Sequence, residues 1–172
     1  AIRGMRNPKN SWDKSDSDYA DAWEDGAIVG KNFWEYEVGQ NDLKLMKTLT
    51  KAGNDHGKFS RFMMVQLDID APLYWWKEMS TYSVGVVVNS CSTMHKIHDK
   101  EFTLDDFSHE HLKDKCRNHL RWTIALLNDA RLGFLETKDK TFWWQMIQLL
   151  PSSYNQKRTV QLNYQVLKSI YF

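Results

Sequence analysis

Apolar residues recur at the spacing of an α-helix through residues 108–133, and this run constrains the fold more than any other feature of the sequence. The residues that share the expected buried face are Leu112, Cys116, Leu120, Ile124 and Leu127. A period near 3.6 over this length predicts an amphipathic helix that packs on an apolar surface. Residues 62–69 instead alternate and carry β-forming side chains, which predicts a strand. We therefore expect an α/β (α+β) fold, a single compact domain with helices packed on a small sheet.

Signals at element ends predict the remaining helices. Asn41 is expected to cap a helix that ends near Gly53, and Pro72 opens a helix over residues 73–82. Further helices are expected over 140–150 and 154–171, and a short apolar strand over 84–88. The first forty residues are polar and acidic, so we expect a loop-rich, solvated surface with one short helix.

The composition is sufficient for a buried core. Of the 172 residues, 42% are hydrophobic, including 8 Trp, 7 Tyr and 8 Phe, which excludes global disorder. One domain spanning residues 1–172 suits this length. The sequence starts at Ala1 without a Met and stops at Phe172 in an apolar stretch, so truncation is open at both ends and is expected above all at the C-terminus.

Charge and cysteine content narrow the function classes. There are 23 basic and 22 acidic residues, a balance that argues against binding of duplex nucleic acid, which needs a basic face. No apolar run approaches the roughly 18 residues that a membrane span requires. Cys91 and Cys116 lack the spacing of a redox or metal motif, so we expect them reduced and buried, in a cytoplasmic protein.

No catalytic signature stands out from the residues alone. His95 and His98 are three apart, but no Cys or carboxylate at a recognised spacing completes a metal set, so no metal is expected. The sequence contains no GxSxG, GxGxxG or GxxxxGK[ST] motif. The pairs Trp75-Trp76 and Trp143-Trp144 can stack on a flat ring, but they are more typical of a core or a subunit contact.

Four stretches, in order and at similar separations, resemble the flavin-dependent thymidylate synthases. They are Ala1-Ile2-Arg3-Gly4-Met5, the segment 51–56 that contains Gly53 and His56, the run from Leu67 through Ala71-Pro72 to His95, and the run from Leu149-Leu150-Pro151 through Asn163 to Leu167. The first stretch is similar to the family's A-x-R segment and the second to its G-H segment. The third is similar to a strand, a helix and the signature loop of the family, and the fourth to its L-P segment with the N-x-R helix that follows. Members of this family use a reduced flavin to help methylate dUMP, with methylene-tetrahydrofolate as the carbon donor.

The resemblance fails at the residues that carry charge in the family. The signature R-H-R-x-x-S-x-N-E-x-S-x-R-Y matches at Asn89 and Ser92, but its R-H-R triplet falls on Tyr82-Ser83-Val84. Its Glu, third Arg and Tyr become Ser90, Met94 and His95. A register shifted by one restores nothing, because residues 62–94 contain no Arg and no His. Asn163 matches the N-x-R segment, but Gln165 replaces its Arg and Ile147 stands where an Arg precedes the L-P segment.

The resemblance therefore implies a diverged, phage-type relative that binds a flavin, with FAD as the expected cofactor, or a pyrimidine nucleotide. The residues that it assigns to this binding are His56, Asn89, Ser92 and Asn163, while catalytic residues stay unknown. Standard dUMP methylation is expected to be lost or altered, since the phosphate would have to be met by Arg3, Lys77, Arg61 or helix N-termini. Two alternatives stay open: a catalytically inert nucleotide-binding or sequestering protein, and a structural, partner-binding protein. The family further implies a homo-oligomer, namely a tetramer.

Overall fold

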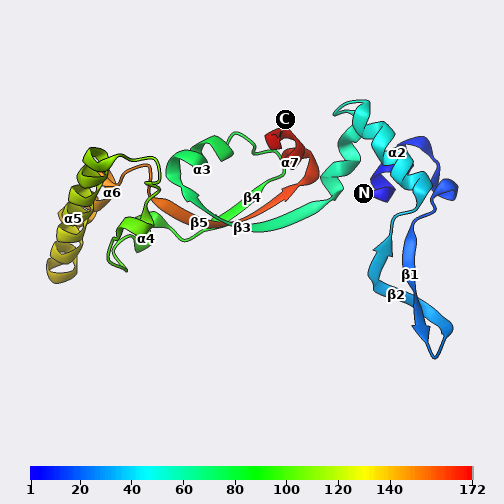
Figure 1. Ribbon diagram of the computed structural model, residues 1–172, viewed down its shortest axis with the longest axis horizontal. Helices are drawn as coiled ribbons and strands as arrows, with labels where there is room; N and C mark the ends of the chain where they lie inside the picture. Colours follow the sequence, from blue (N-terminus) through cyan, green and yellow to red (C-terminus); the bar gives the residue numbers. More distant parts are fainter. Residues whose placement is uncertain (172) are drawn as a thin grey trace. The chain divides into compact units, whose positions relative to one another are not determined.

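The computed structural model describes residues 1–171 and divides into two compact units (Figure 1). Unit 1 comprises Ala1–Val65 with the segment from Leu162 onward, and unit 2 comprises Gln66–Gln161. Helices occur together with one two-stranded and one three-stranded sheet. The predicted mixed α/β class is therefore confirmed, while a single domain over residues 1–172 stays a prediction.

Unit 1 is built around helix α2 (Gln40–Lys51), which packs on α1 (Ile2–Arg6) and on the 3-10 helix η3 (His56–Phe62). Buried Met5, Leu49 and Phe59 form its core. The other elements are the 3-10 turns at Asn7–Lys9 and Trp12–Lys14, strands β1 (Asp18–Glu24) and β2 (Ala27–Glu37), and helix α7 (Tyr164–Tyr171). The predicted helix near Asn41 is confirmed, although Gly39 caps it and Asn41 lies in its first turn.

The expectation of a loop-rich start is wrong, because β1 and β2 pair as an antiparallel hairpin. Asp25 and Gly26 connect the strands with φ angles of 48° and 80°. Both values are positive, as a two-residue type I′ turn requires, and Asp-Gly is a preferred sequence for that turn. The Tyr19 ring forms T-shaped contacts with the rings of Phe33 and Tyr36, and the ring centroids are 5.1 Å apart in each pair. Cross-strand aromatic pairs of this kind stabilise a hairpin, and a prediction from the acidic composition does not take them into account.

The three-stranded sheet places β5 (Asn155–Asn163) between β3 (Met64–Pro72) and β4 (Val87–Ser90). The predicted helix over 154–171 is thus wrong in its first half, where Val160 and Leu162 alternate into the interior and form a strand. The strand predicted over 62–69 is confirmed as β3, which begins two residues later than predicted. The strand predicted over 84–88 is shifted to β4, which runs antiparallel to β5 with Val87 opposite Gln161 and Ser90 opposite Arg158.

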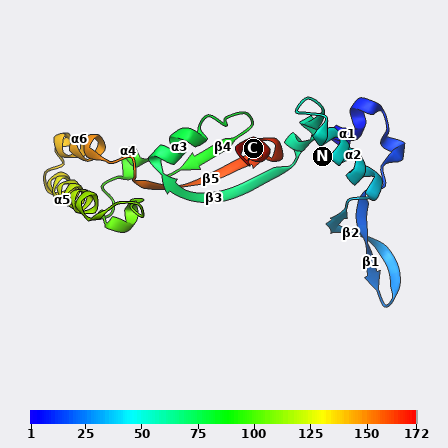
Figure 2. The same ribbon diagram turned by 45° about the horizontal axis from the view of Figure 1, so that its top comes forward.

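Helices α5 (Asp114–Thr137) and α6 (Lys140–Leu149) lie side by side in unit 2 (Figure 2). Leu120, Ile124 and Leu127, predicted from their spacing, are buried in this core together with Met146. The helix continues past Gly133, where we expected it to end. A Cβ atom at that glycine would lie 2.8 Å from the Phe142 ring, so the glycine there permits close packing of α6.

The shorter elements of unit 2 are α3 (Leu73–Met79), α4 (Thr93–Lys96) and the 3-10 turn η4 (Leu104–Asp106). The start of α3 directly after Pro72 confirms the predicted helix opening. Trp76 is buried and Trp143 packs on the α5–α6 core, whereas Trp75 and Trp144 are exposed. The prediction that both cysteines are buried is wrong: Cys91 and Cys116 are exposed free thiols, because they face away from these cores.

One fully buried carboxylate, Asp42, connects three segments of unit 1. It accepts hydrogen bonds of 2.6 Å from Arg6, Ser15 and Ser17. Burial by itself raises the pKa of Asp42, but the hydrogen bonds from the two serines and from Arg6 outweigh it and leave that pKa below its usual range. The backbone N–H groups of Asn41 and Asp42 donate in turn to the Asp16 carboxylate. These bonds attach the segment that leads into β1 to the start of α2.

We predict that Asp42→Asn destabilises unit 1 by about 3–5 kcal/mol, since it leaves the buried Arg6 guanidinium without its counter-charge. Faster hydrogen exchange of the α2 backbone amides would measure this loss, with exposed Asp13→Asn as the matched control. Because the folded-state pKa of Asp42 is lowered, its stabilisation is complete above the unfolded pKa of roughly 4 and is lost as the pH falls below it. The parent should therefore lose protection in acid, and the Asn variant should show no such additional loss. Equal exchange in both variants at neutral pH would contradict this.

Candidate functional site

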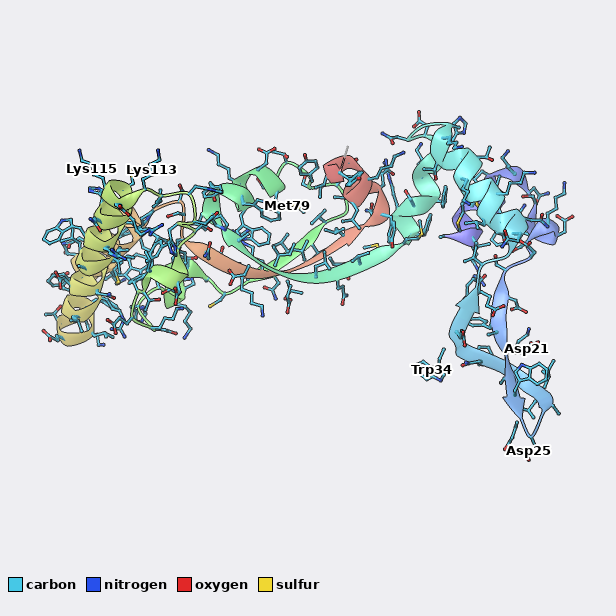
Figure 3. All side chains as sticks on the ribbon, viewed as in Figure 1. Asp21, Asp25, Trp34, Met79, Lys113 and Lys115 are labelled. Atoms are coloured by element: carbon cyan, nitrogen blue, oxygen red, sulfur yellow. The ribbon has the colours of Figure 1, made fainter. Side chains whose placement is uncertain are left out.

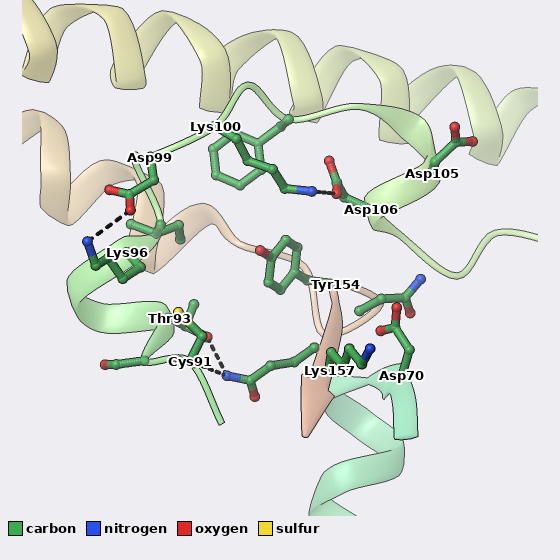
Figure 4. A pocket seen from close by; sticks show the side chains of 15 residues that line it. Asp70, Cys91, Thr93, Lys96, Asp99, Lys100, Asp105, Asp106, Tyr154 and Lys157 are labelled. Carbon is green, nitrogen blue, oxygen red and sulfur yellow. Dashed lines mark hydrogen bonds and ion pairs between the residues drawn. The ribbon is translucent and has the colours of Figure 1, made fainter. Parts of the chain in front are cut away.

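A hollow of unit 2 with a polar lining, which we call the Tyr154 pocket, has a volume of about 420 Å³ (Figure 4). Its wall is formed by the segment around α4, the loop from Asp99 to Asp106 and the start of β5. The lining residues are Asp70, Cys91, Ser92, Thr93, Lys96, Ile97, Asp99, Lys100, Phe102, Asp105, Asp106, Tyr154, Asn155, Gln156 and Lys157. The segment 91–93 belongs to the stretch that resembles the family's signature loop.

Gln156 holds this loop in place. Its side-chain amide donates 2.9 Å hydrogen bonds to the Cys91 carbonyl and the Thr93 hydroxyl, and its amide oxygen accepts one from Arg158. The Gln156 backbone carbonyl accepts a hydrogen bond of 2.9 Å from the Trp76 indole N–H. The Arg158 guanidinium lies over the Trp76 ring, 4.5 Å from its centroid. A single residue of β5 thereby positions both the loop and helix α3.

Tyr154 supplies an aromatic wall with a polar end. Figure 4 shows its side chain pointing into the pocket between Lys100 and Thr93. Its ring packs against Phe107, 5.6 Å away, and Phe102, 6.2 Å away. Burial raises the pKa of the Tyr154 hydroxyl, so the group stays protonated at neutral pH and can donate to a ligand. No hydrogen bond engages this hydroxyl anywhere in residues 1–171.

The cations of the pocket are all paired. Lys96 lies 3.1 Å from Asp99, and Lys157 lies 3.9 Å from Asp68 across the β3–β5 pair. Lys100 pairs with Asp106, and this hydrogen bond raises the pKa of Lys100.

Asp106 is held in its charged form. Burial by itself raises the pKa of this carboxyl. The hydrogen bonds from Lys100 and Thr103 lower that pKa by more than burial raises it, so the net shift is downward. Asp70 and Asp105 also line the pocket and form no ion pair within the described part of the chain. The lining therefore offers an incoming phosphate no free cation.

The four residues assigned from the resemblance lie on different elements, and their binding role stays a prediction. Of these four, all within the described residues, Ser92 alone lines the Tyr154 pocket. Asn89 is exposed on β4 opposite Thr159, and His56 is exposed at the start of η3 in unit 1. Asn163 is buried at the end of β5, where its side-chain oxygen accepts a hydrogen bond of 3.1 Å from the Val166 N–H. This bond caps the start of α7, which is a structural role.

Several residues of the pocket have no signal in the sequence. Gln156 bonds to residues more than sixty positions away, and Lys100 sits in a loop with no motif. Tyr154 could have been predicted from the sequence, since it lies three residues after Pro151 in a stretch that carries the resemblance. Of the cations considered for a phosphate, Arg61 is engaged with Gln165 at 2.6 Å, and none of Arg3, Arg61 and Lys77 lines this pocket.

Among residues 1–171, no three His, Cys, Asp or Glu side chains come together as metal ligands. No helix in the same part of the chain has the length and apolarity needed to cross a bilayer.

Known proteins resemble this chain in structure but not detectably in sequence. No protein-family model matches the sequence. No curated protein sequence matches it either.

Two solved structures of the flavin-dependent thymidylate synthase ThyX from Helicobacter pylori, both complexed with FAD and dUMP, are similar in fold. The first superimposes with a TM-score of 0.60 at 14% identity, over 98% of this chain and 75% of the other. The second has a TM-score of 0.66 at 14% identity, over 98% of this chain and 74% of the other. The chain therefore has a flavin-dependent thymidylate synthase-like fold, as its segment order predicted.

Proposed function

We propose that this chain is a diverged flavin-dependent thymidylate synthase-like protein that binds the flat ring of a flavin or a pyrimidine nucleotide in the Tyr154 pocket. Support comes from the fold shared with two synthases solved with FAD and dUMP, and from the hydrogen-bonding and aromatic groups of the pocket wall. Ser92 and the Tyr154 hydroxyl can both donate to and accept from a ring edge. FAD is the cofactor that we propose.

The observation that carries this proposal is the pairing of all three lysines in the pocket with aspartates. A nucleotide monophosphate brings about two negative charges, which proteins hold with unpaired, preferably bidentate, cations. A phosphate binding here would have to compete with an aspartate for every lysine of the lining, although these ion pairs are largely solvent-exposed and each is worth only about 0–1 kcal/mol. We therefore propose that the ring binds while the phosphate stays outside, so that dUMP methylation is lost or altered.

A phage-type, cytoplasmic accessory protein that sequesters a nucleotide without turnover is the alternative within the same site. Colourless protein stabilised by a nucleotide would favour that alternative, whereas absorption in the flavin bands would favour flavin binding.

A structural, partner-binding role is supported by the exposed aromatic residues of the hairpin. Trp34 is 99% exposed and points away from β2 (Figure 3), and Phe33 and Trp23 are exposed as well. Soluble chains rarely expose so much aromatic surface without a partner. We propose that the partner is another copy of the chain in a homo-oligomer, namely a tetramer.

We predict that dUMP methylation by this protein is far below the rate typical of the family, because its pocket lacks a free cation for the phosphate. The measurement is dTMP formation with flavin, NADPH, methylene-tetrahydrofolate and dUMP, with an active synthase of the family as the positive control. Turnover comparable to that control would refute the loss of methylation. It would also refute the conclusion that the pocket cannot accept the phosphate.

Restoring charge to the signature loop should restore phosphate binding. The variant Tyr82→Arg, Val84→Arg, Met94→Arg is expected to bind dUMP at least about tenfold more tightly than the parent, which corresponds to roughly 1.4 kcal/mol. Val84 and Met94 are exposed and Tyr82 is half-buried, so the arginines need not enter a core. Calorimetric titration measures the change, and the matched variant with glutamine at the same positions should show none. A folded arginine variant without gain would show that these positions do not face the ligand.

We predict that the protein sediments as a tetramer at micromolar concentration. Phe33→Ser with Trp34→Ser should shift it to smaller species, because both side chains are exposed in the chain by itself and cannot contribute to its core. The control Trp122→Ser removes an exposed tryptophan on α5. A monomer in sedimentation equilibrium for the parent chain would contradict the assembly.

A further inference from the structure

A second hollow, of about 380 Å³, lies within unit 1 where α2, η3 and α7 meet. We call it the lysine hollow, after three of the residues that line it, Lys47, Lys51 and Lys168. It contains neither the four residues assigned from the resemblance nor any residue of the Tyr154 pocket. Nothing in the proposed function uses it.

The charge of this hollow is uncompensated. Lys47 and Lys51 are four residues apart and so share one side of α2, and Lys168 approaches from α7. No carboxylate lines the hollow, and none of its three lysines forms an ion pair within the described residues. The Tyr154 pocket is the opposite case, since an aspartate meets each of its lysines. Three unpaired cations around one concave surface raise the local concentration of anions.

The floor of the hollow is apolar. Phe59 is buried there, and Met46 and Met63 pack against it. Methionine side chains adapt to ligands of different shape and contact aromatic rings favourably. A bare inorganic ion would meet the lysines and leave this floor uncovered, so the lining matches a ligand that has both a charge and an apolar body.

We propose that the lysine hollow binds a small organic anion whose phosphate or carboxylate group meets Lys47, Lys51 and Lys168. The apolar body of this ligand lies on Phe59 and the two methionines. The site is independent of the Tyr154 pocket, and its ligand need not be a nucleotide.

Titration of the full chain with four probes separates the two parts of this proposal. The probes are 1-naphthyl phosphate, 1-naphthoate, 1-naphthol and inorganic phosphate, and calorimetry gives each affinity. One of the two naphthyl anions should bind at least about tenfold more tightly than 1-naphthol and inorganic phosphate, and its binding should weaken as salt is added. The tighter anion identifies the head group. Equal binding of 1-naphthol, or of inorganic phosphate, would overturn the proposal.

Two variants place the binding in this hollow. Lys47→Gln, Lys51→Gln, Lys168→Gln should weaken the tighter anion by at least about tenfold. The matched triple Lys9→Gln, Lys115→Gln, Lys140→Gln removes the same charge from exposed positions elsewhere and should leave affinity unchanged.

The second variant, Gly57→Leu, keeps every charge but fills the hollow. A Cβ atom at Gly57 meets no heavy atom within 4 Å, so the folded chain accepts the side chain, and the naphthyl anion should lose affinity. Equal weakening by both lysine triples would show that the anion is attracted by overall charge, and would overturn the site. Unchanged binding in the Gly57→Leu variant would overturn the site as well.

Discussion

Strand β5 is the constraint on which unit 2 depends, because it is the middle strand of the sheet and is bonded to nearly every segment around the pocket. The turn before it accepts hydrogen bonds from the first residues of α3, through the carbonyls of Ser152 and Tyr154, and from Ser108 through that of Ser153. Within the strand, Gln156 holds the segment 91–93 and the Trp76 indole. A break in β5 would therefore loosen the helix, the loop and the pocket together.

The two hollows show how the same residue type acquires opposite uses. Lysines in the Tyr154 pocket lie beside aspartates, so their charge stabilises the wall and is not available to a ligand. No carboxylate of residues 1–171 lines the lysine hollow or forms an ion pair with its lysines, so their charge is available to whatever enters it. A count of lysines in the sequence cannot separate these cases. The difference lies in which acidic residues the fold brings within about 4 Å of each ammonium group.

The family resemblance is informative about the backbone and much less so about the site. Short segments in the same order and at similar separations predicted a fold that two structures at 14% identity share. Backbone architecture tolerates extensive exchange of side chains as long as apolar patterning and volume are kept. Binding of a charged ligand tolerates far less, since it depends on single cations at defined positions. The absence of Arg and His from residues 62–94 can therefore coexist with the same fold.

Sequence alone determined the features that depend on local periodicity and on turn or cap chemistry. Burial of Leu120, Ile124 and Leu127 on α5, the start of α3 after Pro72 and the glycine that follows α2 were predicted correctly, because each rests on residues a few positions apart. Burial of Cys116 on the same helix was not. The prediction of a loop-rich start rested on acidic composition and did not use the Asp25-Gly26 pair, a preferred sequence for the turn that closes the hairpin.

Tertiary structure alone decided the rest. Residues 155–163 became a strand because β3 and β4 flank them, and tertiary pairing overrides a local helical pattern. Ser92 entered a pocket while Asn163 became a helix cap, and this outcome depends on partners that are distant in sequence. Whether each lysine is paired or free likewise depends on contacts that form only when the chain has folded.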